Sequence, residues 1–463
     1  MQKVKNEVTN LSDVHTKDLT TGSPMKLILS FMLPLVFGLL FQQVYSMVDT
    51  IVVGKFLGVD ALAGVGSTGS ITFLVLGLCN GVCAGFAIPV AQKFGQRDFD
   101  GLRRFVGNMI WLSCVIAAAV TLVTTLLCRQ ILLWMDTPAD TFSFAYDYIF
   151  VIFLGIPATM LYNLLSGILR SLGDSKTPLV FLIMCSLLNV VLDIVFILTL
   201  NMGVAGAGLA TLLSQLISGV LCLYFIVKKF PILHLKQDDL RLRKIYVRKL
   251  LNMGLPMGLQ YSITAIGSIM LQTGINGLGS HAVAAVSTGN KVTQLICCPL
   301  DALGTTVATY GGQNIGAKKL DRISKGMRTC VAFGLIYSVI AFFLIKYFGP
   351  TLLSLFIGAE ETSVLADAQY FIMHWVAFCA PLTFVYVFRF MIQGLGFSKL
   401  AVFAGVFEML ARGLISLFWI PAAGFEAVCF ASPVAWIAAD VFLVPAYLWV
   451  RKKLHREFGV TAD

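Results

Sequence analysis

The 463-residue sequence contains little charge: aspartate, glutamate, lysine and arginine make up only 13% of it, whereas 58% is hydrophobic. Its mean hydropathy is +0.85. A soluble protein of this length needs far more charge to cover its surface. Apolar runs near the ~20 residues that span a bilayer recur along the chain, and the short alternating segments of a membrane barrel are absent. The composition therefore predicts an all-α polytopic membrane protein.

Motifs for nucleotide, metal or redox chemistry are also missing. The sequence has no phosphate-loop lysine motif, dinucleotide fingerprint or nucleophile elbow, which argues against ATP-driven transport by this chain alone. Its eleven cysteines form no CxxC pair and no Cys/His ligand spacing, so we expect buried, reduced, structural thiols. The first 25 residues are polar and do not resemble a cleavable signal peptide.

Hydropathy predicts twelve transmembrane helices. They lie near residues 27–53, 62–90, 105–127, 143–165, 179–200, 204–227, 248–275, 283–310, 326–348, 368–393, 400–420 and 425–450. If the N-terminus is cytoplasmic, 28 of the 34 lysines and arginines fall on the cytoplasmic side and three on the opposite side. This asymmetry is the positive-inside signal, so both termini are predicted to be cytoplasmic. The net charge of +10 then belongs to the inner membrane face and does not indicate nucleic-acid binding.

The two halves of the sequence resemble each other at a nearly fixed offset. AQKFGQRDFDG (91–101) matches GQNIGAKKLDR (312–322) at an offset of 221. Matched pairs at offsets of 221 or 222 include Gln92 with Gln313, Gly95 with Gly316, Gly203 with Gly424, and Pro34 with Pro256. Because each repeat has six helices, both insert with the same orientation. We therefore expect two parallel six-helix repeats, related by a pseudo-twofold axis along the membrane normal and enclosing a shared cavity.

This organisation divides the chain into five parts. They are a cytoplasmic tail (1–26), an N-lobe (27–227), a cytoplasmic linker (228–247), a C-lobe (248–450) and a second cytoplasmic tail (451–463). The linker mixes charges with Ile and Leu. That mixture predicts either an amphipathic stretch lying on the bilayer or a solvated loop that helps to set topology.

Two acidic residues lie at membrane depth in the N-lobe. Asp49 is in the first helix, where the run FQQVYSMVDTIVVG has no basic residue. An acid at that depth costs roughly 2.5–3.5 kcal/mol on insertion scales, so it should face a protein interior or a wet cavity. Asn189 and Asp193 lie four residues apart, on one face of the fifth helix. The two acids could share a proton or hold a monovalent cation; the alternative for each is a structural hydrogen bond between helices.

Polar residues of the C-lobe fit structural roles more simply. Glu408 and Arg412 are four residues apart and should neutralise each other. Lys291 and Arg389 are possible partners of the embedded acids, which the sequence alone cannot pair. The other polar positions noted are Asp301, Asp440, Gln260 and His374, of which His374 is more typical of packing than of a proton relay.

The ordered set of motifs resembles the MATE (multidrug and toxic compound extrusion) family over nearly the whole chain. The resemblance rests on VYSMVDTIVVGKFLG (44–58), NLLSGILRSLGDSKTP (163–178), NVVLD (189–193) and GVAGAGLAT (203–211). It implies an antiporter that exports organic, often cationic compounds, driven by inward movement of protons or sodium ions. It also implies a coupling site at Asp49, Asn163, Asn189, Asp193 and Thr211, of which Asn163 and Thr211 rest on the resemblance alone. A sodium ion would be held by Asp49, Asn189, Asp193 and Thr211, and no other cofactor is expected.

One departure from the family pattern concerns the C-lobe. The NorM-type branch has acidic residues in the seventh and tenth helices. Here the seventh helix offers Gln260 and Gln272, and the tenth carries His374 and Arg389. The N-lobe pattern is therefore closer to DinF-like or MepA-like members, with ion coupling confined to the N-lobe.

Two other functions fit the sequence less well. A flippase for a lipid-linked saccharide would favour a strongly cationic cavity, but the embedded bases are only Lys291, Arg389 and Arg412. An integral-membrane enzyme would need His or acidic ligands clustered near one membrane face, and the sequence shows no such cluster. We expect small organic substrates, the lipid bilayer of the cytoplasmic membrane as surroundings, no nucleic-acid partner, and a monomer.

Overall fold

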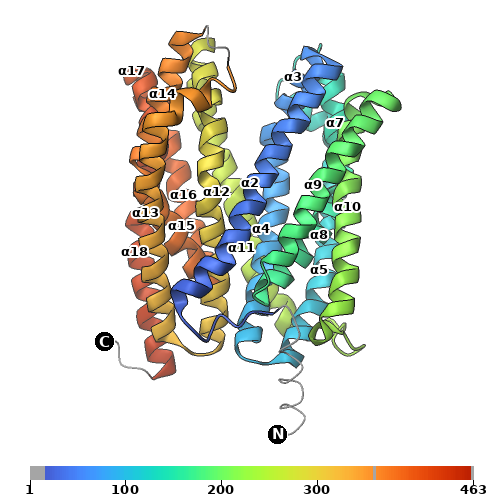
Figure 1. The fold of residues 1–463 in the computed structure, drawn as a ribbon, viewed down its shortest axis with the longest axis vertical. Helices are drawn as coiled ribbons and strands as arrows, with labels where there is room; N and C mark the ends of the chain where they lie inside the picture. The colour runs from blue at the N-terminus through green and yellow to red at the C-terminus, as the bar shows by residue number, and fades with distance from the viewer. Residues whose placement is uncertain (1–15, 358–360, 460–463) are drawn as a thin grey trace. The chain divides into compact units, whose positions relative to one another are not determined.

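The computed structural model describes residues 16–357 and 361–459, and every regular element in these ranges is a helix (Figure 1). Eight spans within them are long and apolar enough to cross a membrane. Their main helices are α2 (Pro24–Leu57), α4 (Gly69–Gly95), α5 (Phe99–Leu126), α9 (Lys176–Ile194), α10 (Gly203–Lys229), α13 (Leu320–Leu353), α16 (Ser398–Leu414) and α18 (Phe425–Phe458). Two more helices, α11 (Lys244–Asn276) and α12 (Ser280–Gly316), are as long but richer in polar residues.

Two predicted helices are broken rather than continuous. α7 (Phe142–Leu154) meets α8 (Ile156–Ser171) at a bend of 46°, and α14 (Thr362–Ala377) meets α15 (Cys379–Gly394) at 50°. A proline lies in the first turn after each break, Pro157 in α8 and Pro381 in α15. Because proline lacks a backbone donor and crowds the preceding turn, the hydrogen-bond ladder stops there. With each bent pair counted as one span, the segments correspond to the twelve predicted helices.

Shorter elements extend or join these spans. They are α3 (Val59–Ser67), α6 (Cys128–Trp134), α17 (Ile420–Ala423), the 3₁₀ turn η3 (Pro231–Leu233) and the π-helical turns η2 (Val195–Thr199) and η4 (Ile415–Trp419). Many helices also run past the predicted bounds; α12, for example, was predicted over 283–310. Hydropathy marks the part of a helix that lies in hydrocarbon, whereas the helix itself continues into the polar interface.

Contacts divide the chain into two compact units. Unit 1 comprises the N-terminal segment up to Gly22, Phe37–Leu255 and Gly312–Ala317. Unit 2 comprises Ser23–Val36, Pro256–Gly311 and the chain from Lys318 onward. Long helices thus change unit along their length: α2 does so close to Pro34, α11 at Pro256, and α12 at its last turns.

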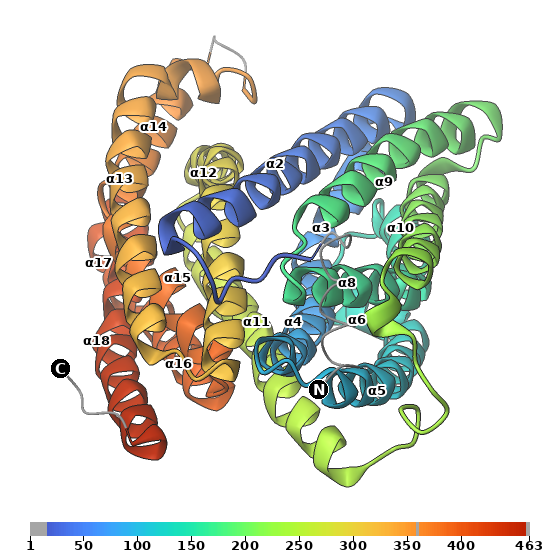
Figure 2. The same ribbon diagram turned by 60° about the horizontal axis from the view of Figure 1, so that its bottom comes forward.

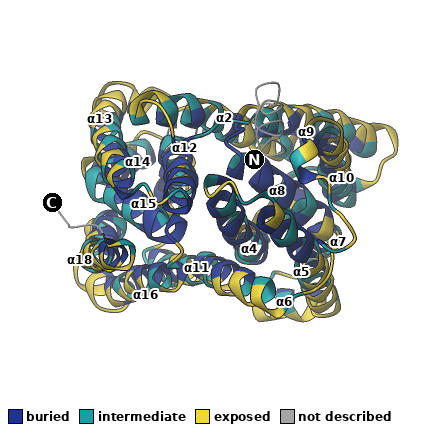
Figure 3. Ribbon diagram, turned by 90° about the horizontal axis from the view of Figure 1, so that it is seen from below, coloured by how far each residue is buried: buried dark blue, intermediate teal, exposed yellow. Residues whose placement is uncertain are grey.

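In unit 1, the core is built around α4 and α8, which pack against each other and are mostly buried (Figure 3). α10 packs against α7, α8 and α9. Side chains such as Phe86, Met109 and Phe153 fill the space between helices. Large apolar side chains on α5 and α10, such as Val115 and Tyr224, are exposed instead. We take these outward faces as the ones that lipid covers, since no soluble protein would leave so many uncovered.

In unit 2, α18 packs against α14, α15 and α16, and α13 packs against α14 and α15 (Figure 2). Ile345, Val387 and Leu443 are fully buried among these helices. Val339, Phe418 and Val441 are exposed apolar side chains, as on the outer helices of unit 1.

The duplicated sequence folds into duplicated local geometry. Gly203 and Gly424 align at an offset of 221. Gly203 begins α10 with φ of 61°, and Gly424 directly precedes α18 with φ of 62°. Arg97 and Lys318, at the same offset, both have φ of 57°. The π-helical turns η2 and η4 each follow the corresponding fifth helix of their repeat. Left-handed φ values are uncommon for side-chain-bearing residues, so their recurrence supports a true repeat.

The linker after α10 folds back onto α5. Asn108 Nδ2 donates to Arg241 O at 3.2 Å, and Asn108 Oδ1 accepts from Arg243 N at 2.9 Å. Trp111 Nε1 donates to Leu240 O at 3.0 Å. Since these bonds hold the main chain, the linker has a fixed path along α5. Neither sequence alternative, an amphipathic stretch on the bilayer or a solvated loop, anticipated this contact.

The turn between α4 and α5 is held by Asp98, the residue before α5. Its Oδ1 accepts from Gly101 N at 2.9 Å, and Lys93 Nζ lies 2.6 Å from its Oδ2. Burial by itself would raise the pKa of Asp98, but the hydrogen bonds from Lys93 and Gly101 and the charges of Lys93 and Arg104 bring the pKa below its usual range. Asp98 is thus an ionised helix cap at neutral pH.

Candidate functional site

Asp49 of α2 and Asp193 of α9 come together within unit 1. Their side chains are hydrogen-bonding partners when one carboxyl carries a proton. Asp193 is fully buried, and Asp49 is partly buried. With both ionised, Asp49 Oδ1 and both oxygens of Asp193 are buried without a hydrogen-bond partner among the described residues. Because a buried charge is costly without a partner, this geometry calls for a proton or a cation between the two groups.

An amide and a hydroxyl flank the acidic pair. Asn189, one turn before Asp193, donates from Nδ2 to Thr211 Oγ1 of α10 at 3.3 Å. That bond turns the amide so that Asn189 Oδ1, which is buried, has no partner within the described part of the chain. Asn189 itself is 2% exposed. Carboxylate, amide and hydroxyl oxygens are the ligand types that hard cations prefer, so the same group of residues suits a monovalent metal ion as well as a proton.

Asn163 is placed differently from its predicted role. It lies on α8, where its Nδ2 donates to Thr159 O of the same helix at 2.9 Å. This bond uses the amide within α8, and none of the contacts observed links Asn163 to Asp49 or Asp193. Its part in the coupling site stays a prediction.

Two tyrosines that the sequence analysis missed join the acidic pair. Tyr45 of α2 and Tyr148 of α7 each interact electrostatically with both Asp49 and Asp193. A phenol can donate a hydrogen bond to a carboxylate, so these hydroxyls are suited to the ionised form of the pair. Tyr45 precedes Asp49 by four residues and so lies on the same face of α2, which the sequence could have indicated. Tyr148 comes from a different helix and carried no such signal.

The helix that bears Asp193 changes its winding directly after that residue. α9 ends at Ile194, and η2 continues it with π-type winding. Such turns occur frequently at functional sites, since they interrupt the regular hydrogen-bond ladder and redirect side chains. Next to the turn, Val53, Ile197 and Ala207 form a small buried cluster against which Tyr148 packs. The acidic pair therefore has an apolar boundary on that side.

Unit 2 holds a buried charged cluster on α15 and α16. Glu408 of α16 forms an ion pair with Arg389 of α15, and its Oε2 lies 3.8 Å from Arg412 Nη2. Glu408 is 3% exposed and each arginine 8%. The predicted Glu408–Arg412 pair is present but incomplete, because Arg389 is the nearer partner. The suggestion that Arg389 pairs with Asp301 or Asp440 is corrected in part, because its ion pair is with Glu408, although its charge also acts on Asp440.

The two other embedded acids of unit 2 have different surroundings. Asp301 of α12 hydrogen-bonds with Tyr386 of α15. Asp440 of α18 has a buried Oδ1 without a hydrogen-bond partner in the described ranges. Lys291, the second suggested partner, lies over the ring of Phe356 at 5.4 Å from its centroid. No ion pair between Lys291 and either acid is present among the described residues.

Gln260 and His374 make local contacts in unit 2. Gln260 Oε1 accepts from Gln393 Nε2 at 2.6 Å, and both side chains are buried. The His374 ring lies 4.2 Å from that of Tyr370 and 5.0 Å from that of Phe430, between centroids. The histidine thus packs among aromatic rings, as its sequence context suggested.

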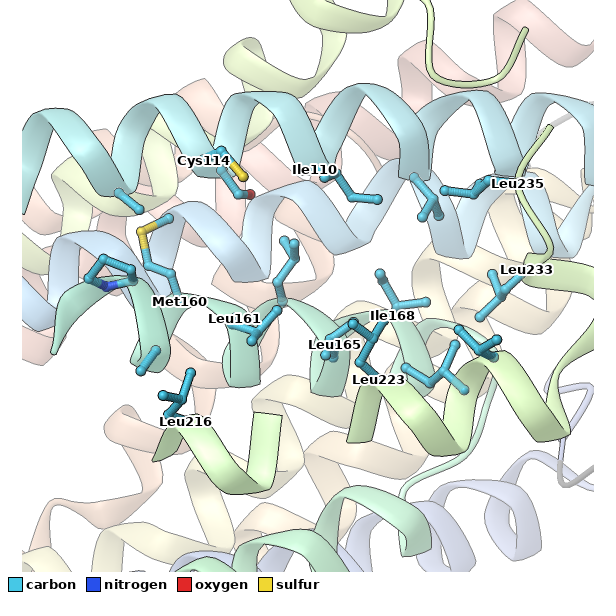
Figure 4. Close-up of a pocket in the computed structure, with 18 of the residues that line it drawn as sticks. Ile110, Cys114, Met160, Leu161, Leu165, Ile168, Leu216, Leu223, Leu233 and Leu235 are labelled. Atoms are coloured by element: carbon cyan, nitrogen blue, oxygen red, sulfur yellow. The ribbon is translucent and has the colours of Figure 1, made fainter. Parts of the chain in front are cut away.

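An apolar pocket of about 860 Å³ lies in unit 1 between α5, α8 and α10 (Figure 4). Ile110 and Cys114 line it from α5, Leu165 from α8 and Leu223 from α10, and the segment after η3 contributes Leu235. No aspartate or glutamate lines it. Leu223 is 42% exposed, so the pocket borders the lipid-facing surface. It suits acyl chains or apolar rings and is separate from the acidic pair.

Comparison with known proteins yields concordant matches. A family model described as MatE matches residues 34–195 and 256–417, two segments that begin 222 residues apart. The chain is 29% identical over 352 residues to the probable multidrug resistance protein YoeA of Bacillus subtilis (strain 168), covering 74% of this chain and 76% of that protein. It is 29% identical over 408 residues to the probable multidrug resistance protein YpnP of the same organism, covering 87% and 88%.

A solved structure shows the same fold. It is described as a crystal structure of MATE in complex with MaL6, and it superposes with a TM-score of 0.87 at 23% identity, covering 95% of this chain and 98% of that chain. Together with the doubled family match, this confirms the predicted all-helical architecture of twelve transmembrane helices in two repeats.

Proposed function

Since the chain belongs to the MatE family, whose members are transporters and not enzymes, we propose that it is a multidrug efflux antiporter of the cytoplasmic membrane. The names of the two relatives from Bacillus subtilis support export of organic compounds, and the acidic site supports a cationic preference. The bias of lysine and arginine supports an orientation with both termini in the cytoplasm. A two-repeat carrier of this size can operate as a monomer.

The pairing of Asp49 with Asp193 is the observation that carries the coupling mechanism. When a proton or sodium ion binds, it neutralises two carboxylates that otherwise repel each other. The phenol groups of Tyr45 and Tyr148 are suited to donate to the ionised form, while Asn189 and Thr211 supply neutral oxygens for a metal ion. Binding of the ion and binding of a cationic substrate then compete for the same negative charge, which couples their opposite movements.

Conformational coupling follows from the duplicated architecture. Two repeats of like orientation can expose a substrate site alternately to either side of the membrane. The ion shifts this equilibrium only if it binds one conformation more tightly than the other. A pair of carboxylates on two different helices, α2 and α9, provides that difference, because any change in the packing of these helices alters the distance between the two charges.

A flippase for lipid-linked saccharides fits the charge distribution less well. Such substrates carry phosphates and need basic groups that are not already neutralised. The embedded Arg389 and Arg412 share the carboxylate of Glu408, so one of their two positive charges is neutralised within unit 2. The antiporter is therefore the better-supported function.

The test uses efflux of a fluorescent organic cation from proteoliposomes, driven separately by a pH gradient and a sodium gradient. We expect Asp49→Asn and Asp193→Asn to reduce gradient-driven efflux to the rate measured without a gradient, and to weaken binding of the dye, because each removes negative charge for which the ion and the dye compete. Asp60→Asn is the matched control, since Asp60 is an exposed acid of α3. The coupling assignment is wrong if Asp49→Asn retains the gradient-driven rate of the parent protein. The two gradients also distinguish proton from sodium coupling.

A further inference from the structure

The apolar pocket between α5, α8 and α10 is an elongated groove whose length matches one leaflet of a bilayer. On α5 its lining residues run from Val106 to Ala118, and on α8 from Pro157 to Ile168. At a rise of about 1.5 Å per residue, these stretches are about 18 Å and about 17 Å long. The hydrocarbon core of a bilayer is about 30 Å thick, so each leaflet contributes about 15 Å. The groove is therefore long enough for an acyl chain of one leaflet.

The groove opens toward lipid along α10. Leu216, Leu223 and Val227 line it from this helix, and all three side chains are exposed. α8 packs against both α5 and α10 and so forms the floor of the groove (Figure 4). Apolar side chains exposed at membrane depth are covered by acyl chains. Because the lining residues all belong to unit 1, the groove is complete within that unit.

The linker closes one end of the groove. Leu233, the last residue of η3, lines this end together with His234 and Leu235. His234 Nε2 donates to Val227 O at 2.7 Å, which ties the segment to the last turns of α10. The other end lies at Pro157, next to the break between α7 and α8 and thus in the middle of a span. A lipid whose chain follows the groove therefore has its headgroup at the linker.

Basic side chains adjoin the linker end of the groove. Lys228 follows Val227 in α10, and Lys236 follows Leu235 in the linker. Both lysines are exposed, and neither forms an ion pair with any residue that the structure describes. The ammonium group of Lys228 lies 5.6 Å from the centroid of the exposed Tyr224 ring. Lysine and tyrosine side chains of this kind typically lie at the level of the lipid headgroups.

The nearby acids of the linker are paired with other bases. Asp238 and Asp239 form ion pairs with arginines: Arg104, Arg241 and Arg243 for the first, and Arg103 for the second. The positive charge of Lys228 and Lys236 is therefore in excess at this end of unit 1. Basic groups beside a cleft between transmembrane helices are typical of sites for anionic lipid headgroups.

We propose that this groove binds an anionic phospholipid, with one acyl chain along α8 and the headgroup beside Lys228, His234 and Lys236. A chain that enters the groove leaves a bilayer that is equally apolar, so the chain alone gives little preference for one lipid over another. The headgroup supplies that preference, since its negative charge meets lysines that no described carboxylate neutralises. In the proposed orientation the lipid belongs to the cytoplasmic leaflet, but its binding requires neither that orientation nor antiport.

Native mass spectrometry of the purified protein in detergent tests the headgroup, with phosphatidylglycerol and phosphatidylcholine of identical acyl chains. We expect the first phosphatidylglycerol to bind at least about tenfold more tightly than the first phosphatidylcholine, equivalent to about 1.4 kcal/mol. The double variant Lys228→Gln, Lys236→Gln should lose this preference and keep its affinity for phosphatidylcholine. Lys55→Gln, Arg129→Gln is the matched control, because it removes the same charge from exposed residues of α2 and α6 that do not line the groove.

Filling the groove tests the acyl chain. Cys114 lines the groove from α5 and is exposed, so Cys114→Trp places a large ring there without displacing a buried side chain. Val115→Trp is the matched control, since Val115 is the next residue, is exposed and does not line the groove. We expect Cys114→Trp to weaken binding of the first lipid of either kind about tenfold, and Val115→Trp to bind as the parent does. If Cys114→Trp does not elute as a monodisperse peak, Ala118→Phe takes its place, because Ala118 is also exposed and lines the groove.

Four results would overturn the proposal. Equal affinity for the two lipids would mean that the groove holds lipid no differently from the rest of the surface. Unchanged binding in the variant with the filled groove would place the anionic lipid elsewhere. Displacement of the bound lipid by the fluorescent organic cation would assign the groove to substrate, and a dimer that forms on removal of lipid would assign it to a second copy of this chain. The measurement uses no ion gradient, so a failure of the proposed antiport leaves it unaffected.

Discussion

Removal of Glu408 should destabilise unit 2 severely, because it leaves two arginines buried without their shared carboxylate. Breaking a buried ion pair by deleting one partner costs about 3–5 kcal/mol. Here both guanidinium groups lose the carboxylate that they share, so the upper end of this range applies. The carboxyl group of Asp440, which interacts with Arg389, offsets part of this cost. Glu408→Ala is therefore expected to cost about 5 kcal/mol, comparable with the whole stability of many domains.

Thermal unfolding in detergent, followed with a dye that fluoresces on reaction with thiols, is the suitable assay. Nine of the eleven cysteines are buried, so thiol exposure reports loss of packing in both units. The matched control is Glu426→Ala, which removes an exposed acid from α18 and should leave the unfolding temperature unchanged. A combined Arg389→Met, Glu408→Leu, Arg412→Met protein should recover most of the loss, since buried charges can often be replaced by apolar groups of similar size.

An unfolding temperature of Glu408→Ala equal to that of the control would contradict this expectation. That outcome would mean that water reaches both guanidinium groups and that the cluster is not desolvated. A variant that is destabilised but not rescued by the triple substitution would instead show that the cluster is needed for a specific arrangement of α15 and α16, beyond charge neutrality.

Three further predictions concern unit 1. Thr211→Val should weaken sodium dependence of efflux more than proton dependence, as it removes a neutral oxygen and the partner of Asn189; equal effects on both ions would contradict this. Asn108→Ala should release the linker, so that trypsin cuts at Arg241 or Arg243 faster in inside-out vesicles, and unchanged cleavage would show that the bonds to Asn108 are not needed. Asp98→Ala should lower stability by about 1 kcal/mol through loss of the cap. Since the folded pKa of Asp98 lies below its unfolded value, this stabilisation is present above about pH 4 and disappears as pH falls through the folded pKa, so melting curves of parent and variant should converge in acid.

The sequence predicted those residues of the candidate site that can be recognised from their own helix alone. Asp49 stood out as an acid in an apolar helix, and Asp193 as an acid on the same face as Asn189. Their proximity followed from similar depth in the membrane, and the structure brings the two together. Tyr148 could not be found this way, because its helix offers many apolar and aromatic neighbours and no periodic pattern marks the face that lies toward the acidic pair.

Charge pairing in unit 2 shows the same limit. The spacing of Glu408 and Arg412 predicted a contact within one helix, and that contact exists. The nearer partner, Arg389, lies on α15, and the sequence offered Asp301 and Asp440 as equally good partners. Which of these acids an arginine meets depends on the rotation and depth of neighbouring helices, set by packing along their whole length.

By itself, the sequence determined that the protein lies in a membrane and how many helices span it, since both depend on the free energy of placing single side chains in hydrocarbon or water. The matched positions of the two halves also showed that the six-helix unit is duplicated. The sequence also marked the acids that are costly in hydrocarbon. Only the tertiary structure decided the helix breaks, the arginine that pairs with Glu408, and the hydrogen bond from Leu19 N to Gln313 Oε1. Leu19 and Gln313 are 294 residues apart in the chain. Contacts at such separation arise from the packing of many helices at once and leave no periodic trace in either segment.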